Sequence, residues 1–257
     1  QIFLLPVTSG WYPPYLRAFP QAPPAILYVS GTGYREAICR RYQLTIVGSR
    51  KATAYGRRFL HEHLPMLAES GFNIISGLAR GIDGAAHQGS LDSGAMTLAV
   101  VGHGLDQCYP PEHRELMAAI KEQGAVLSEF LPGTTLKRNS FPARNRILSG
   151  LGQATFVVEA DARSGSLITA NQAAEGGRDV FALPGSVFTT MSRGCLQLLT
   201  EGALLVRHSG DIISGLGQPA ETPFRLYSRG LPGRSGEQVE TSVDAVANEV
   251  EPLGLRI

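Results

Sequence analysis

From Leu44 onward, the sequence repeats one unit: a short apolar run, a glycine-containing turn, and a segment with helical spacing of apolar residues. The runs are apolar throughout, which is typical of strands covered on both faces. Strands and helices in regular alternation favour a parallel sheet between two helical layers. We therefore predict a Rossmann-like, doubly wound, mainly parallel α/β fold. Strands are predicted at residues 44–47, 72–75, 96–101, 125–127, 154–158, 180–182 and 203–206. Helices are predicted at residues 54–69, 83–92, 112–122, 143–151, 166–176 and 192–200.

The chain is expected to have three regions. Residues 1–43 are rich in Pro, Tyr and Gly, and their proline pairs interrupt any long helix. We expect a lead-in arm there, or the remnant of an N-terminal domain, because the sequence opens without Met. Residues 44–214 form the predicted Rossmann-like domain. Residues 215–257 hold one weakly helical run, at 242–250, and are expected to be a linker with part of a poorly ordered C-terminal region.

Composition indicates an ordinary globular protein. Of 257 residues, 43% are hydrophobic, and the formal net charge is +1. Such a balance creates no overall basic field, so a site for a polyanion requires local segregation of charge. Three widely spaced cysteines fit a reducing compartment. The apolar runs are too short to span a bilayer. We expect a cytoplasmic protein with no membrane partner.

Charge is segregated most clearly in residues 137–146, which hold four cations and one aromatic ring without a carboxylate. Arginine presents a planar set of donors that matches phosphate oxygens, and an exposed phenylalanine offers a face on which any base can stack. A solvated basic loop is the alternative interpretation. The position of the stretch in the fold decides between the two.

Ligands of doubly wound sheets bind beyond the carboxyl ends of the strands, where glycine turns and helix N-termini face anions. Gly48-Ser49-Arg50 follows the first predicted strand, residues 76–83 follow the second, and residues 159–166 follow the fifth. The basic stretch lies between the fourth and fifth strands, at the same edge. We therefore expect one rim to collect Arg50, Arg80, Lys137, Arg144, Arg146 and Arg163.

Cofactor and metal motifs are absent from the sequence. No turn matches the G-x-G-x-x-G or P-loop pattern, so neither NAD nor ATP chemistry is predicted. His61 and His63 lie two residues apart, on different faces of a helix, which is a poor spacing for a metal pair. Asp83 and His87 are one helical turn apart, and we favour a capping aspartate with a structural histidine. Glu159 is the one acid placed for catalysis, although pairing with a rim arginine or orienting its loop is favoured.

Several motifs in one order resemble the DprA (Smf) family of bacterial DNA-processing proteins, from about Tyr12 to about Val206. The motifs are Val47-Gly48-Ser49-Arg50, Ser76-Gly77-Leu78-Ala79-Arg80-Gly81-Ile82-Asp83, Phe141-Pro142-Ala143-Arg144-Asn145-Arg146 and Ser164-Gly165-Ser166-Leu167-Ile168-Thr169-Ala170. The resemblance implies a non-catalytic, dimeric protein of natural transformation that binds single-stranded DNA, protects it and helps load the RecA recombinase. A complete winged helix, which follows the core in many members, is not readable in residues 215–257.

By motif matching, the resemblance assigns the family's DNA pocket to Gly48, Ser49, Arg50, Arg80, Lys137, Phe141, Arg144, Asn145, Arg146, Ser164, Gly165, Ser166 and Thr169. By analogy, Leu196, Leu199, Leu204 and Leu205 are expected at a homodimer interface, although they could simply close the sheet. The alternative function is a nucleotide-processing enzyme, similar to the phosphoribohydrolases, which would present Glu159 in a closed pocket. A strand binder requires an open groove that includes Phe141. A third possibility is a platform for protein partners.

Overall fold

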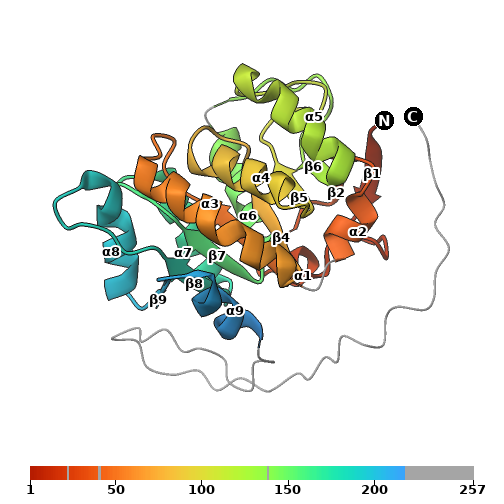
Figure 1. The fold of residues 1–257 in the computed structure, drawn as a ribbon. Helices are drawn as coiled ribbons and strands as arrows, with labels where there is room; N and C mark the ends of the chain where they lie inside the picture. Colours follow the sequence, from red (N-terminus) through yellow and green to blue (C-terminus); the bar gives the residue numbers. More distant parts are fainter. Residues whose placement is uncertain (22, 40–41, 138, 218–257) are drawn as a thin grey trace, which may run out of the picture.

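The computed structural model describes residues 1–21, 23–39, 42–137 and 139–217 (Figure 1). Arg138 and nearly all of the predicted C-terminal region, with its helical run at 242–250, lie outside the described residues. Within the described part, no helix is long and apolar enough to cross a membrane.

The described residues form one sheet in the order β1-β2-β6-β5-β4-β3-β7-β8-β9. From β6 to β9, neighbouring strands are parallel. By contrast, β2 is antiparallel to both β6 and β1. The mainly parallel, Rossmann-like sheet predicted from the sequence is confirmed. The strands are β1 (Phe3–Pro6), β2 (Ile26–Ser30), β3 (Tyr42–Val47), β4 (Phe72–Ser76), β5 (Thr97–Val100), β6 (Ala125–Ser128), β7 (Ala154–Val157), β8 (Asp179–Ala182) and β9 (Leu204–Leu205).

Helices cover both faces of this sheet (Figure 1). Leu44 and Ile46 of β3 pack toward α3, α4 and α9, whereas Val47 packs into the cluster that α1, α2, α6, α7 and α8 share. This alternation buries both faces of the strand, as its continuous apolar sequence predicts. The helices are α1 (Pro14–Arg17), α2 (Tyr34–Cys39), α3 (Ala54–Glu69), α4 (Ile82–Asp92), α5 (Arg114–Gln123), α6 (Ser140–Leu151), α7 (Gly165–Glu175), α8 (Arg193–Thr200) and α9 (Ser209–Gly217).

Before Leu44, the structure contains two strands that were not predicted. β2 pairs with β6, about a hundred residues later, and β1 then adds outside β2. The lead-in segment is therefore part of the sheet, and Tyr12 and Leu16 are buried in its core. Pairing with a partner so far along the chain leaves little trace in the local sequence, which explains why these strands were missed.

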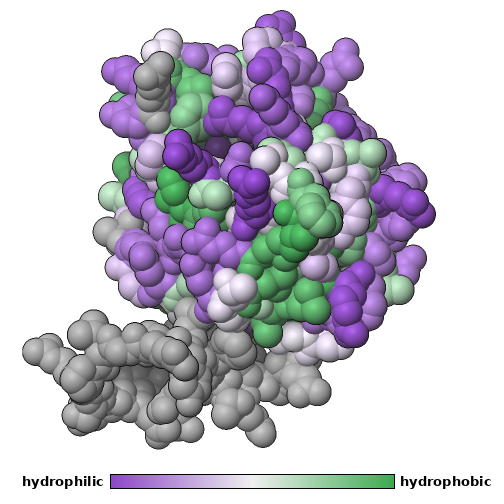
Figure 2. All heavy atoms as spheres, turned by 90° about the vertical axis from the view of Figure 1, so that its left-hand side faces the viewer, coloured by the Kyte–Doolittle hydropathy of each residue, from purple (hydrophilic) through white to green (hydrophobic). Residues whose placement is uncertain are grey.

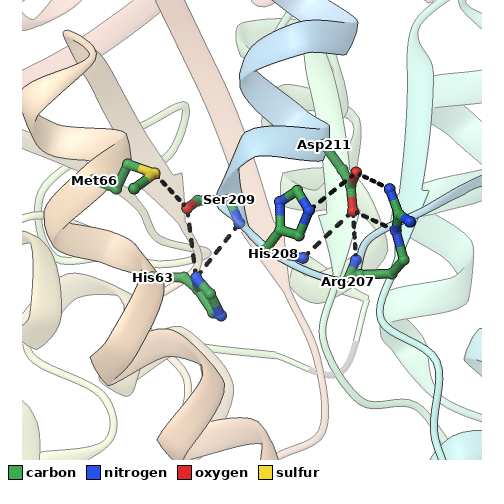
Figure 3. Close-up of polar contacts among 6 residues, drawn as sticks. All are labelled: His63, Met66, Arg207, His208, Ser209 and Asp211. Carbon is green, nitrogen blue, oxygen red and sulfur yellow. Dashed lines mark hydrogen bonds and ion pairs between the residues drawn. The ribbon is translucent and has the colours of Figure 1, made fainter.

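The last described helix, α9, was also not predicted, and it begins with a capped turn (Figure 3). The Asp211 carboxylate accepts the backbone N–H groups of Arg207 and His208, at 2.7 and 3.4 Å, and also the Arg207 guanidinium. An acid in the first turn satisfies donors that the helix itself leaves free.

The start of α9 rests on α3 (Figure 3). The Ser209 hydroxyl lies 3.1 Å from Met66 Sδ and 3.4 Å from His63 Nδ1. The ring of His63 also packs on Phe59, at 4.3 Å between centroids, and burial lowers the pKa of His63. His63 thus joins two helices.

Candidate nucleic-acid interface

A groove of about 430 Å³ lies beyond the carboxyl ends of β3 and β7, between α6 and the N-terminus of α7. The structure brings most of the predicted site residues together there. Those that line the groove are Gly48, Ser49, Arg50, Phe141, Arg144, Asn145, Ser164, Gly165, Ser166 and Thr169. Figure 2 views the molecule from the side of α8, and a hollow lies there among hydrophilic residues, with an apolar patch below it.

The turn after β3 presents Arg50 at one side of the groove. The Ser49 N–H donates to the Glu159 carbonyl at 2.7 Å, and the Ser49 hydroxyl accepts the N–H of Lys51 at 3.0 Å. Gly48 is required because a Cβ at this position would lie 2.6 Å from Ile82. The turn is thus fixed by its backbone, while the Arg50 and Lys51 side chains are exposed.

Phe141 lies in the first turn of α6, and the Arg50 guanidinium stands 4.8 Å from the centre of its ring. This pair separates the groove from a smaller hollow, of about 30 Å³, which both residues also line. The phenylalanine ring is half-buried. The groove therefore offers a cation and an aromatic face side by side.

Arg144 lies one turn further along α6. It lines the floor of the groove, and its side chain is only 5% exposed. Its Nη1 atom donates to the carbonyls of Gly77 and Val100, each at 2.6 Å. Burial lowers the pKa of Arg144, and the nearby Asp83 carboxylate opposes that shift. Arg144 thus joins α6 to the ends of β4 and β5.

Asp83 lies in the first turn of α4 and holds the turn between β4 and α4, whereas the helix has no side-chain cap. Its carboxylate accepts the N–H groups of Gly77 and Ala79. His87 is fully buried, and its Nδ1 lies 2.8 Å from the Thr97 hydroxyl. The two residues serve different networks. The prediction of a structural histidine is confirmed, whereas the prediction of a helix-capping aspartate is wrong.

The predicted rim is only partly formed. Arg80 is paired with Glu112, whose pKa it lowers to about 2, and lines the smaller hollow. Arg146 is paired with Glu129 and lines a separate hollow beside Pro24. Lys137 is exposed and does not line the groove. Sequence order placed these cations near one edge, but tertiary ion pairs direct two of them elsewhere.

On the opposite side, the groove is bounded by the N-terminus of α7. Ser164 is the N-cap, and its hydroxyl accepts the N–H of Ser166 at 3.3 Å and is hydrogen-bonded to the Ser166 hydroxyl. A Cβ at Gly165 would meet nothing within 4 Å, so this turn is open to the groove. Thr169 and Asn145 are buried behind it. The positive end of the helix dipole suits an anion here.

The further groove residues that were not among the predicted contacts include Lys51, Asp161 and Met191. Lys51 directly follows Arg50, so the sequence did carry a signal for it. Met191 lies far away in the chain and reaches the groove because its sulfur contacts the Ser49 hydroxyl at 3.3 Å. No local pattern indicates such a contact. Arg163, expected on the rim, does line the groove.

Glu159 is not presented to the groove. Its carboxylate accepts both the N–H of Thr53, at 2.8 Å, and the Thr53 hydroxyl, and it is 4% exposed. Gly56 packs directly against it. This carboxylate therefore holds the start of α3, and in the described residues it does not pair with a rim arginine.

The four leucines predicted at a dimer interface lie on α8 and β9. Leu199 and Leu204 pack against the core, Leu196 is partly buried, and Leu205 is 47% exposed on the outermost strand. Phe188, in the loop before α8, is 95% exposed. Figure 2 shows an apolar patch on this side of the molecule. The dimer interface stays a prediction.

Comparison with known proteins adds to this geometry. The sequence pattern of the family described as DNA recombination-mediator protein A matches residues 4–217. Protein Smf of Escherichia coli is 44% identical over 214 residues, which are 83% of this chain and 56% of that protein. The chain therefore spans just over half the length of that relative.

Two solved structures resemble the fold closely. DNA processing protein A (DprA) from Streptococcus pneumoniae has a TM-score of 0.78 and 39% identity, covering 82% of this chain and 74% of that one. DNA processing protein A from Helicobacter pylori, whose structure concerns its single-stranded DNA binding mode, has a TM-score of 0.75 and 27% identity, covering 84% and 95%.

Proposed function

Because this chain belongs to the DNA recombination-mediator protein A family, we propose that its groove binds single-stranded DNA as part of DNA processing in natural transformation. One observation carries the proposal: the Arg50–Phe141 pair faces the open N-terminus of α7 across the groove. A cation, an aromatic face and the positive end of a helix dipole are elements that bind a strand through its phosphates and bases.

The charges of the groove are suited to phosphate. The cations that line it are Arg50, Lys51, Arg144 and Arg163, against the carboxylates of Asp83 and Asp161. Asp83 and Arg144 lie below the groove, so Arg50, Lys51 and Arg163 are the cations proposed to meet the strand. Such contacts are independent of sequence and weaken with salt.

Phe141 gives a preference for single strands. A base can stack on an aromatic ring only when it is unpaired and splayed from its neighbours, whereas a duplex presents its phosphates and hides its base faces. The half-buried ring at the groove edge is placed for one base. We therefore expect tighter binding to a single strand than to a duplex of equal length.

The wider role follows the family. We propose that the protein acts without catalysis in the cytoplasm, shields incoming DNA and passes it to the RecA recombinase. We further propose a homodimer through Leu196, Leu199, Leu204 and Leu205. The carboxylate of Glu159 is occupied by Thr53, which supports a binding protein over a nucleotide-processing enzyme.

A charge-removal series tests the DNA site. Fluorescence anisotropy measures the affinity of a labelled single-stranded oligonucleotide for the wild type and for Arg50→Ala and Arg163→Ala. The control is Arg35→Ala on α2, an exposed cation beyond the end of β2, at the opposite edge of the sheet. We expect each groove variant to weaken binding about fivefold or more at low salt, and the control to change it little. Equal effects of the three substitutions would contradict the proposal.

A further inference from the structure

The Gly77 peptide, at the end of β4, is held from two sides. The Gly77 carbonyl accepts Nη1 of Arg144 at 2.6 Å, and the Gly77 N–H donates to Asp83 Oδ2 at 3.2 Å. The same Asp83 oxygen accepts the N–H of Ala79 at 3.4 Å, and the same Arg144 nitrogen donates to the Val100 carbonyl. Both side chains are more than nine-tenths buried. We call this pair the Asp83–Arg144 clamp.

The clamp fits closely around one glycine. A Cβ at Gly77 would lie 2.1 Å from Arg144 Nη1 and 2.7 Å from Asp83 Oδ2. The next residue, Leu78, has a φ of 56°, in the left-handed region, and its side chain is fully buried. That conformation is sterically unfavourable for a residue other than glycine, so surrounding contacts must hold it. The clamp supplies them on both sides of Leu78.

The turn at residues 77–82, which the clamp holds, supports the side of the groove that bears Arg50. Ala79 lines both the groove and the smaller hollow. The Ile82 N–H donates to the Ser49 carbonyl at 3.1 Å, which ties the start of α4 to the turn after β3. Gly81 lies against that turn so tightly that a Cβ would stand 2.2 Å from the Ser49 carbonyl oxygen. A shift at residues 77–82 would therefore move Arg50.

We propose that Asp83 and Arg144 are positioning residues, which set the affinity of the groove for DNA by fixing the turns that carry Arg50 and Ala79. The inference rests on the proposed function. It assigns to Arg144 a role different from that of a phosphate contact, because its Nη1 is used by two carbonyls and the Asp83 carboxylate also stands close to Gly77.

Charge and positioning predict opposite results for one substitution. Asp83→Asn removes a negative charge beside an anion site, so electrostatics alone predicts tighter binding of DNA. An asparagine oxygen is a weaker acceptor than a carboxylate, so the clamp loosens and binding weakens if positioning dominates. Asp161→Asn is the matched control, because Asp161 also lines the groove but takes no part in the clamp.

The experiment measures oligonucleotide affinity over a range of salt concentrations. We expect Asp83→Asn to weaken binding about tenfold, roughly the contribution of one hydrogen bond to a charged group. Asp161→Asn should bind at least as tightly as the wild type. Arg144→Lys retains the charge, but its ammonium ends one bond short of the position of Nη1 and should hold the two carbonyls less well. It should therefore weaken binding without changing the salt dependence. Binding by Asp83→Asn that equals or exceeds that of the wild type would overturn the proposal.

Hydrogen exchange gives a readout independent of DNA. The amides of Gly77 and Ala79 donate to Asp83 and should exchange about tenfold faster in Asp83→Asn, while amides of α7 stay unchanged. Unaltered exchange at both amides would also contradict the proposal that Asp83 holds this turn. If the wild type binds no oligonucleotide, the proposed function fails, and the exchange measurement still decides whether the clamp exists.

Discussion

Phe141→Ala separates base stacking from charge in the groove. Stacking of one base on an aromatic ring contributes about 1–3 kcal/mol. In the free protein, the Arg50 guanidinium already lies 4.8 Å from this ring, a contact that is worth about 0.5–1 kcal/mol at an exposed site. If a base replaces that contact, the net gain is about 1–2 kcal/mol. We therefore expect Phe141→Ala to weaken binding by about 5–30-fold.

The salt dependence tells the two effects apart. Each phosphate neutralised on a single strand contributes about 0.7 to the slope of log affinity against log salt. Arg50, Lys51 and Arg163 together predict a slope of about −2, or about a 20-fold loss between 50 and 200 mM salt. Arg50→Ala should make the slope shallower by about 0.7. Phe141→Ala removes no charge and should leave the slope unchanged.

The assay is fluorescence anisotropy with a short single-stranded oligonucleotide at four salt concentrations. Phe188→Ala is the control, because this phenylalanine is 95% exposed and does not line the groove. The double variant of Arg50 and Phe141 should lose about 0.5–1 kcal/mol more than the sum of the single losses, because each single variant already lacks the ring contact that a base must displace in the wild type. Unchanged affinity of Phe141→Ala, or a slope shifted as much as by Arg50→Ala, would refute the reasoning.

Three further outcomes are expected. Gly77→Ala should lower the free energy of unfolding by about 1–3 kcal/mol, measured in urea, because its Cβ would collide with Arg144; full stability would contradict this packing. Glu159→Gln should lower the thermal midpoint by weakening the acceptor for Thr53, with a cost of about 1 kcal/mol, and an unaltered midpoint would count against that role. Burial lowers the pKa of His87 to about 3, so the folded protein binds fewer protons than the unfolded chain, and the free energy of unfolding should fall as the pH falls from about 6.5 toward 3. His87→Gln should flatten that fall, and an equally steep fall in this variant would exclude His87 as its cause.

The parallel core was predictable because its signals are local. The helix predicted at residues 54–69 has those bounds in the structure, where Thr53 caps its start. The strand predicted at residues 72–75 ends one residue later. Apolar runs bounded by glycine turns require no knowledge of distant partners. β1 and β2 could not be found in this way, because they form by antiparallel pairing at the edge of β6.

The site was predictable to a similar degree. Glycine turns and helix starts fixed the positions of Arg50, Phe141 and Ser164, because the carboxyl ends of parallel strands share one edge. The positions of the other cationic side chains depend on the acids with which they pair. Arg80 and Arg146 are paired with acids from other segments, and the sequence does not reveal such pairs. Charge counted along the chain overestimated the charge available in the groove.

Photochemical cross-linking tests the central claim most directly. A single-stranded oligonucleotide that carries 5-bromouracil is irradiated with the wild-type protein, and the cross-linked peptides are identified by mass spectrometry. We expect the principal cross-link in the peptide that carries Phe141, and its loss in Phe141→Ala. Cross-links found only on elements that do not line the groove would contradict the proposal that single-stranded DNA binds between Phe141 and the N-terminus of α7.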